Sequence, residues 1–243
     1  MTTYRLDFAY DGTRFHGYAR QPNVRTVQGE LENALFKLTG EVETAVAGRT
    51  DKGVHATAQV LSFVSDEMLD SERIVRSLNR QLAPEIAVSS LTVAPDGFNA
   101  RFSATGRAYI YLILNRSTPD PFLASTSWHY ETQLDIEVMN RGLQHLIGEH
   151  DFAAFCRRAD GRSTVRRLDS AEWTARTDGI LALAVAASSF CHQMVRSLVA
   201  LSVEIGRGRV DPDDVPAILT SRDRHRAKGA APPHGLTLVG VRY

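Results

Sequence analysis

A single carboxylate stands in a short polar loop between two glycines in the first half of the chain. Residues 48–55 read Gly-Arg-Thr-Asp-Lys-Gly-Val-His, so Asp51 is flanked by Arg49 and Lys52. Opposite charges beside a carboxylate favour its ionised form. The two glycines allow positive φ values and a close approach of the backbone to a ligand. An ionised carboxylate on such a loop is a candidate nucleophile. The alternative is that Asp51 caps a turn, because Asp-X-Gly is ordinary turn chemistry.

Other groups could face an anion or a base. His192 and Arg196 are four residues apart in a segment predicted as a helix, so they are expected to share a face. Apolar neighbours favour an inward-pointing Arg196, and Asp51 is our candidate for its anionic partner. Tyr109 and Tyr111 lie on one face of a predicted strand. Such tyrosines either pack in the core or stack on a nucleic-acid base.

Basic residues gather in a few stretches, although the chain has a formal net charge of zero. Each stretch by itself is typical of a solvated face, but several arginine-rich loops on a neutral protein favour a surface that follows phosphates. The stretches are Arg14, Arg20 and Arg25; Arg157, Arg158, Arg162, Arg166 and Arg167; and Arg222, Arg224, His225, Arg226 and Lys228.

Several classes of site are excluded by missing motifs. Asp51 and His55 are four residues apart, but no HExxH or clustered Cys/His pattern indicates a metal site. The glycine loop does not match the GxxxxGK[ST] motif of nucleoside triphosphate binding. A GxSxG nucleophile elbow is absent, and a glycosidase would need a second carboxylate. A lone carboxylate among arginines suits a polyanionic substrate.

Composition indicates an ordinary globular protein of 243 residues. The longest weakly polar run, residues 180–190, is about half of the ~20 residues that a membrane span needs. No signal-peptide pattern precedes the first strand. Two cysteines, Cys156 and Cys191, make no disulfide framework and lack the CxxC spacing of a metal site. We therefore expect a cytoplasmic, reduced and metal-free protein that contacts no membrane.

Hydrophobic periodicity predicts the order β-α-β-β-α-β in the first half, the split arrangement of ferredoxin-like units. Thr26 and Ser71 are the expected N-caps of the two helices, and Gly40 is expected to end the first. The expected strands are residues 4–10, 43–47, 59–64 and 86–93.

The second half repeats this rhythm. Asp135 is expected to cap a helix that Gly148 ends, and a long helix carries an apolar stripe from Phe190 to Ile205. We predict an α+β fold with an N-terminal lobe of residues 1–98 and a C-terminal lobe of residues 99–243. Both lobes are expected to be ferredoxin-like, with antiparallel sheets that join into one central sheet. The remaining expected elements are strands at residues 103–115, 168–174, 180–187 and 236–241 and a short helix at residues 215–219.

Several motifs, taken in order along nearly the whole chain, resemble the TruA family of tRNA pseudouridine synthases. The specific one is Ala-Gly-Arg-Thr-Asp at residues 47–51 with Gly-Val-His-Ala at residues 53–56. The weaker ones are Tyr-Asp-Gly-Thr at 10–13 with Phe-His-Gly at 15–17; Ala-Arg-Phe-Ser-Ala-Thr at 100–105 with Arg107 and Tyr109; Gly148 with Asp-Phe at 151–152; Phe190 with His192 and Met-Val-Arg at 194–196; and Gly-Leu at 235–236 with Leu-Val at 238–239.

The resemblance implies a pseudouridine synthase fold and a role for several residues. Asp51 corresponds to the family's catalytic aspartate, Arg196 to the basic residue that pairs with it, and Tyr109 to the tyrosine that stacks on the target base. Arg49 corresponds to the loop arginine that helps to extrude the nucleotide. The further residues assigned to substrate contact are Lys52, His55, Arg14 and His16.

The resemblance also implies the reaction and the partners. The family converts uridines 38, 39 and 40 of the tRNA anticodon stem–loop to pseudouridine, as a homodimer and without a cofactor. The carboxylate attacks C1′, adds to C6 or removes a proton from C2′, and the sequence leaves all three routes open. The alternative function is a non-catalytic module that binds or folds tRNA.

The chain departs from the family pattern near the site. Tyr18 and Ala19 stand where the family usually has Trp-Gln, and Lys52 replaces a small residue. Gln193 and Ser197 replace residues that are more often His and Asn. None of these positions is catalytic, so they bear on the tRNA contacts and on the range of positions modified.

Overall fold

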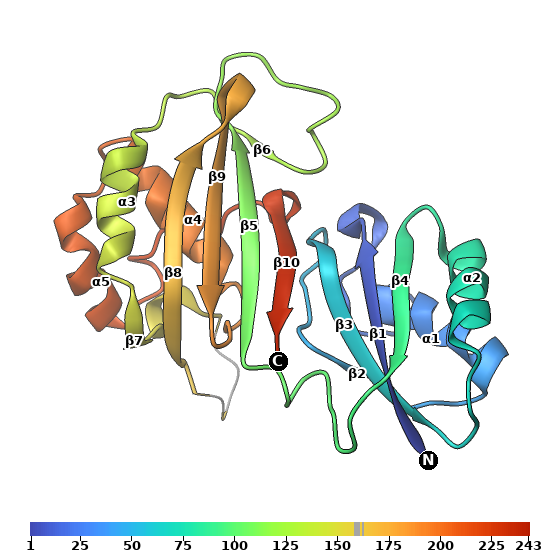
Figure 1. The fold of residues 1–243 in the computed structure, drawn as a ribbon. Helices are drawn as coiled ribbons and strands as arrows, with labels where there is room; N and C mark the ends of the chain where they lie inside the picture. Colours follow the sequence, from blue (N-terminus) through green and yellow to red (C-terminus); the bar gives the residue numbers. More distant parts are fainter. Residues whose placement is uncertain (158–160, 162) are drawn as a thin grey trace. The chain divides into compact units, whose positions relative to one another are not determined.

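The computed structural model describes residues 1–157, 161 and 163–243 and divides into two compact units. The first unit contains residues 1–105 and 237–243, and the second contains residues 106–236. Both units combine strands with helices (Figure 1), so the predicted α+β class is confirmed. Within the described residues, every helix is too short or too polar to cross a membrane.

The first unit has the predicted β-α-β-β-α-β order. Its strands lie side by side as β4-β1-β3, with β2 on β3, and all of these neighbours are antiparallel. The last strand of the chain, β10, pairs in parallel with β3 through Thr237 and His55. The elements are β1 (Thr2–Tyr10), α1 (Val27–Thr39), β2 (Ala45–Val46), β3 (His55–Ser65), α2 (Ser71–Leu82), β4 (Ile86–Val93) and β10 (Leu236–Arg242).

Local chemistry explains the helix boundaries of this unit. The Thr26 hydroxyl accepts a hydrogen bond from Gly29 N at 3.2 Å, and Gly40 ends α1 with φ of +72°, as predicted. The predicted cap of α2 was wrong by one residue. Asp70, and not Ser71, accepts a hydrogen bond from Arg73 N, at 3.0 Å, because its carboxylate reaches the exposed backbone of the first turn.

The second unit places its strands in the order β5-β9-β8-β7, each antiparallel to its neighbour, with β6 parallel to β5. Helices α3 and α4 pack closely, because a Cβ on Gly206 would lie 2.7 Å from Met139 Sδ. The elements are β5 (Gly106–Leu114), β6 (Trp128–His129), α3 (Ile136–Gln144), β7 (Gly148–Asp151), β8 (Val165–Ala175), β9 (Ile180–Ala187), α4 (Met194–Gly206) and α5 (Val215–Ser221).

Two helix predictions in this unit were wrong. Helix α3 ends at Gln144, and Gly148 begins β7 instead of ending the helix. Helix α4 begins only at Met194, because Gln193 has φ of +66° and interrupts helical geometry. His192 therefore precedes α4 and does not share a helical face with Arg196. The short strands β6 and β7 were not predicted.

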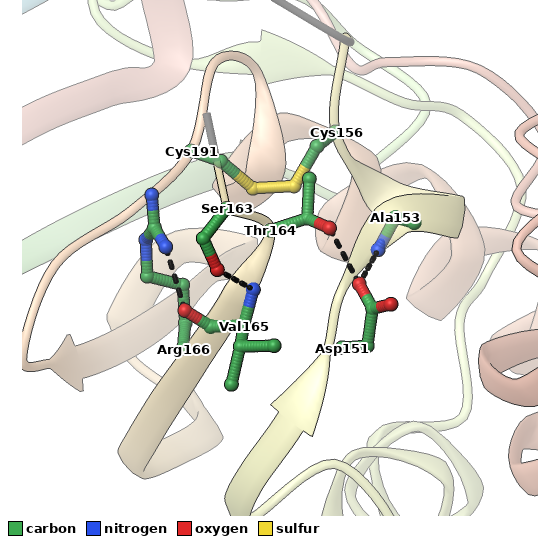
Figure 2. The surroundings of a disulfide bond; sticks show 8 residues. All are labelled: Asp151, Ala153, Cys156, Ser163, Thr164, Val165, Arg166 and Cys191. Carbon is green, nitrogen blue, oxygen red and sulfur yellow. Dashed lines mark hydrogen bonds between the residues drawn. A yellow bond between two sulfur atoms is a disulfide. The ribbon is translucent and has the colours of Figure 1, made fainter. Parts of the chain in front are cut away.

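The expectation of reduced cysteines was also wrong. Figure 2 shows Cys156 joined to Cys191 by a disulfide bond, with the two Cα atoms 5.7 Å apart. The two residues are 35 positions apart in the sequence, but their backbones run together, since Arg157 N donates to His192 O at 2.9 Å. Sequence spacing alone could not reveal this meeting of two loops.

Candidate active site

Asp51 lies at the start of a tight turn between β2 and β3. Val54 N donates a hydrogen bond to Asp51 O at 3.2 Å, and Gly53 takes a φ of +78°. Asp51 is half-buried, whereas Arg49 and Lys52 are both exposed. A turn residue and a nucleophile are therefore compatible interpretations of the same aspartate.

The 3₁₀ helix Gly12–Arg14 and the residues after it pack directly on this turn. A Cβ on Gly12 would lie 2.0 Å from Val54 O. Gly17 has φ of +94°, and its Cβ would lie 3.1 Å from Thr50 O. Tyr18 N also donates to Thr50 O at 3.0 Å. The glycines of the two N-terminal motifs thus allow backbone to lie on backbone beside Asp51.

His55 is buried at the beginning of β3, with 5% of its surface exposed. Its Nδ1 accepts a hydrogen bond from Gly12 N at 3.1 Å and lies 3.1 Å from Asp11 Oδ1. Burial acts to raise the pKa of Asp11, but hydrogen bonds from Thr13 and the nearby His55 outweigh it and lower that pKa. These contacts connect the 3₁₀ helix to the turn that carries Asp51. The contact of His55 with substrate stays a prediction.

Four basic groups predicted to contact substrate are exposed in the same unit as Asp51. Lys52 Nζ lies 3.4 Å from His16 Nε2, so these two side chains meet at the surface of the turn. Arg14 lies 3.7 Å from Glu85 Oε1, and 80% of its side chain is exposed. Arg49 is exposed between Gly48 and Thr50. Their exposure is compatible with the predicted contact with RNA.

Tyr109 and Tyr111 of β5 have different surroundings, although they share a face of the strand. Tyr111 is fully buried, and its hydroxyl donates to Pro232 O at 2.9 Å, so it is a core residue. Tyr109 keeps 9% of its surface exposed and contacts the Phe190 ring edge-on, with the centroids 5.2 Å apart. Phe190 thereby fixes the orientation of the Tyr109 ring.

Arg196 lies in the first turn of α4 and is half-buried. Its Nε donates to Ala231 O at 2.7 Å, and its own carbonyl accepts from Ala231 N at 2.9 Å. Burial raises the pKa of Tyr111, and the positive charge of Arg196 opposes that rise. The guanidinium is therefore anchored on one side by the backbone around residue 231.

The two predicted arginine stretches of the second unit lie close to one another at Asp151, whose Oδ1 accepts a hydrogen bond from Thr164 Oγ1 at 2.5 Å. Arg222 Nε forms an ion pair with Asp151 Oδ2 at 3.0 Å, and Arg224 donates a hydrogen bond to Gln193 Oε1. We call residues 151–157, 163–167 and 222–228 the basic region. Arg157 and Arg167 are exposed in it, while burial lowers the pKa of Arg166. Arg158 and Arg162 of the predicted stretch lie outside the described residues.

Two buried residues that hold the Asp51 turn were not predicted from the sequence. Gln59 has no exposed surface, and Tyr10 is 5% exposed. Both bond to the segment around Thr50. The only signal in the sequence is a single amide beside the apolar run Val60 to Val64, and an amide in a strand is not by itself diagnostic.

Comparison with known proteins agrees over almost the whole chain. The model of a family described as tRNA pseudouridine synthase matches residues 8–103 and 143–243. A tRNA pseudouridine synthase A of Frankia casuarinae is 44% identical over 98% of this chain and 88% of its own length. The Leifsonia xyli protein of the same name is 42% identical over 100% of this chain and 92% of its own length. The Bacillus subtilis protein is 38% identical over 98% of each chain.

The family match covers residues of both units, including the turn that carries Asp51 and the start of α4. Pseudouridine synthases are isomerases, so the resemblance drawn from the motifs is confirmed at the level of reaction class. The chain belongs to the TruA family of tRNA pseudouridine synthases.

Proposed function

We propose that this enzyme converts uridines 38, 39 and 40 of the tRNA anticodon stem–loop to pseudouridine, with Asp51 as the nucleophile. The observation that carries the proposal is the single half-buried carboxylate on a backbone-braced turn, with basic side chains on both sides of it. Membership of the TruA family supports the substrate class.

The reaction breaks the C–N glycosidic bond and forms a C–C bond between the same sugar and base. All atoms are kept, and no electrons leave the substrate. Asp51 would attack C1′, add to C6 or deprotonate C2′, and each route requires an ionised carboxylate. We propose that Arg196 keeps Asp51 ionised and directs it, since an adjacent cation favours the charged form.

The target uridine must leave its helix to react. Extruding a base costs a few kcal/mol, and stacking on the Tyr109 ring would offset part of this. The edge contact from Phe190 supports this role, because it fixes the ring before the base arrives. We assign extrusion to Arg49. Contact with the substrate is assigned to Lys52, His55, Arg14 and His16, of which all but His55 are exposed.

We further propose a cytoplasmic homodimer that needs no cofactor. Isomerisation within one nucleotide requires no redox or group-carrying cofactor, and tRNA processing is the setting implied by the family. Sedimentation of the purified protein, alone and with tRNA, tests the dimer. A monomer under both conditions would contradict it.

The test of the nucleophile is tritium release from tRNA labelled at uracil C5. Formation of the new C–C bond displaces that hydrogen, so the wild type should release tritium. Asp51→Ala should reduce release at least about a thousandfold while still binding tRNA. Asp96→Ala, which removes an exposed carboxylate of the same unit, is the matched control and should behave as wild type.

Two results would overturn parts of the proposal. Wild-type release by Asp51→Ala would exclude it as the nucleophile, and loss of tRNA binding would indicate a structural aspartate. Substrates that carry uridine at only one of positions 38, 39 and 40 then identify the positions modified. Release from none of them would contradict the proposed sites.

A further inference from the structure

We infer that Gln59, Tyr10 and Thr50 are positioning residues that fix the backbone on which Asp51 is aimed. This inference rests on the proposed role of Asp51. It concerns a chain of hydrogen bonds that runs from the middle of β3, through the end of β1, to the residue next to the nucleophile.

Gln59 is the base of this chain. Its side chain is completely buried, and both hydrogens of its amide nitrogen are used. Nε2 donates to Gly48 O at 2.8 Å and to Tyr10 Oη at 3.3 Å. The amide oxygen accepts from Val60 N at 3.3 Å. One side chain therefore holds the first residue of the loop and orients the next link.

Tyr10 is the middle link. Its hydroxyl lies 2.8 Å from Thr50 Oγ1, and because it accepts from Gln59 it has its proton left to donate to Thr50. Burial raises the pKa of Tyr10 to about 12, so the hydroxyl remains a donor at any physiological pH. A register shift between Phe8 and Tyr10 in the pairing of β1 with β3 accompanies this placement. Irregular pairing of this kind commonly redirects a side chain at the end of a strand.

Thr50 connects the chain to the nucleophile. Its hydroxyl is held by Tyr10, and its carbonyl accepts from Tyr18 N at 3.0 Å. Together with Gly48 O, held by Gln59, and Asp51 O, held by Val54 N, these bonds fix the backbone on both sides of Arg49. A carboxylate on a backbone fixed in this way loses little conformational freedom when it reacts.

The alternative is that the three side chains serve stability alone. An apolar residue would fill the buried position of Gln59 without the need to satisfy an amide, so the polar choice indicates a requirement for geometry. If the network is purely structural, removing one of its hydrogen bonds should lower the unfolding temperature and leave turnover at low temperature unchanged. If the network positions Asp51, the same removal should lower kcat even where the protein is fully folded.

The experiment measures kcat, KM for tRNA and unfolding temperature, with turnover recorded at least about 20 °C below unfolding. Thr50→Val and Tyr10→Phe each remove one hydroxyl at nearly constant shape, and we expect kcat to fall about 10- to 100-fold with KM within about twofold. Gln59→Met removes both donors and should have an effect of at least this size. Thr50→Ser keeps the hydroxyl that Thr50→Val removes, so its kcat should stay within about threefold of wild type.

Tyr4→Phe is the matched control. Tyr4 lies on the same strand, is fully buried, and its hydroxyl accepts from Leu69 N at 2.9 Å, away from the turn. It should lower the unfolding temperature and leave kcat unchanged. The inference is overturned if Thr50→Val and Tyr10→Phe lose no more kcat than Tyr4→Phe, or if they change only KM. If Asp51→Ala keeps full activity in the same assay, the proposed function fails, whatever these variants do.

Discussion

The loop that carries Asp51 and the basic region of the second unit are held by different means. Buried, uncharged hydrogen bonds from Tyr10, Gln59 and the backbone of Tyr18 support the loop. The basic region is stabilised by the disulfide between Cys156 and Cys191 (Figure 2). It is also held by the ion pair of Arg222 with Asp151, in which the Arg222 side chain is 64% exposed.

This difference fits two proposed roles, that of Asp51 as the nucleophile and that of the basic region as a surface for the phosphates of tRNA. Buried neutral bonds are insensitive to salt and keep one geometry, which suits a nucleophile. An exposed ion pair contributes at most about 1 kcal/mol, so an arginine can exchange its carboxylate partner for a phosphate at little cost. The ion pair of the basic region is therefore easier to exchange than the buried hydrogen bonds of the Asp51 loop.

The largest effect is expected where backbone lies on backbone beside the loop. Gly12→Ala would place a Cβ 2.0 Å from Val54 O, and the backbone of both segments would have to move. We expect a loss of about 3–5 kcal/mol in the free energy of unfolding, with a large loss of kcat. Urea denaturation and tritium release measure the two effects.

Gly97→Ala is the control for this prediction. Gly97 has φ of +74°, but a Cβ at this position would meet no other atom within 4 Å. Only backbone strain of about 1–2 kcal/mol therefore applies. If Gly12→Ala lowers the free energy of unfolding no more than Gly97→Ala does, close packing at Gly12 does not stabilise the Asp51 loop.

Much of this architecture could be predicted from local signals. The capping Thr26, the terminating Gly40 and the alternation of β1 identified their elements because the physics is local. The two glycines around Asp51 placed it on a loop because this turn signal is contiguous in the sequence, and the family motif then implied its role. These predictions needed no knowledge of distant contacts.

What could not be predicted depends on pairs that are distant in the sequence. The parallel pairing of Thr237 with His55, the bond of Gln59 to Gly48 and the meeting of Cys156 with Cys191 exist only in the folded chain. The predicted start of α4 was wrong for a different reason. The apolar stripe continues to Phe190, but the left-handed conformation of Gln193 leaves no trace in the periodicity.

Reduction of the disulfide should have the next largest effect. A cross-link between residues 35 positions apart constrains the unfolded chain, so its loss should lower the free energy of unfolding by about 2–4 kcal/mol. Urea denaturation with and without a thiol reductant measures the shift. The Cys156→Ser/Cys191→Ser double variant should be insensitive to the reductant, and an equal shift in both proteins would exclude the disulfide as the cause.

The basic region should control the salt dependence of tRNA binding. Replacing an arginine that contacts a phosphate should reduce the slope of log affinity against log salt by about 0.7–0.9. We expect this for Arg157→Gln and Arg226→Gln, each weakening binding several-fold without changing kcat. Arg76→Gln, on an exposed face of α2 in the first unit, is the control and should keep the wild-type slope. Unchanged slopes for the first two variants would remove the basic region from the RNA surface.

The smallest effect is expected from a charge pair in the first unit, which tests whether charges contribute to holding the loop. Arg25 donates to Glu85 at 2.6 Å, and this hydrogen bond lowers the pKa of Glu85 from its ordinary value of 4.5. A lowered pKa in the folded state stabilises the protein above the ordinary value, and that contribution disappears as the pH falls through the folded pKa. Glu85→Gln should therefore lower the free energy of unfolding by about 0.5–1 kcal/mol at pH ~7 and by less at a pH well below 4.5.

Glu72→Gln, whose side chain is 86% exposed, is the control for this charge pair and should change little at either pH. Urea denaturation at the two pH values measures both variants. A loss well above about 1 kcal/mol for Glu85→Gln at neutral pH would exceed what a surface ion pair supplies. Charges would then also hold the segment beside the Asp51 loop, and the contrast with the basic region would weaken.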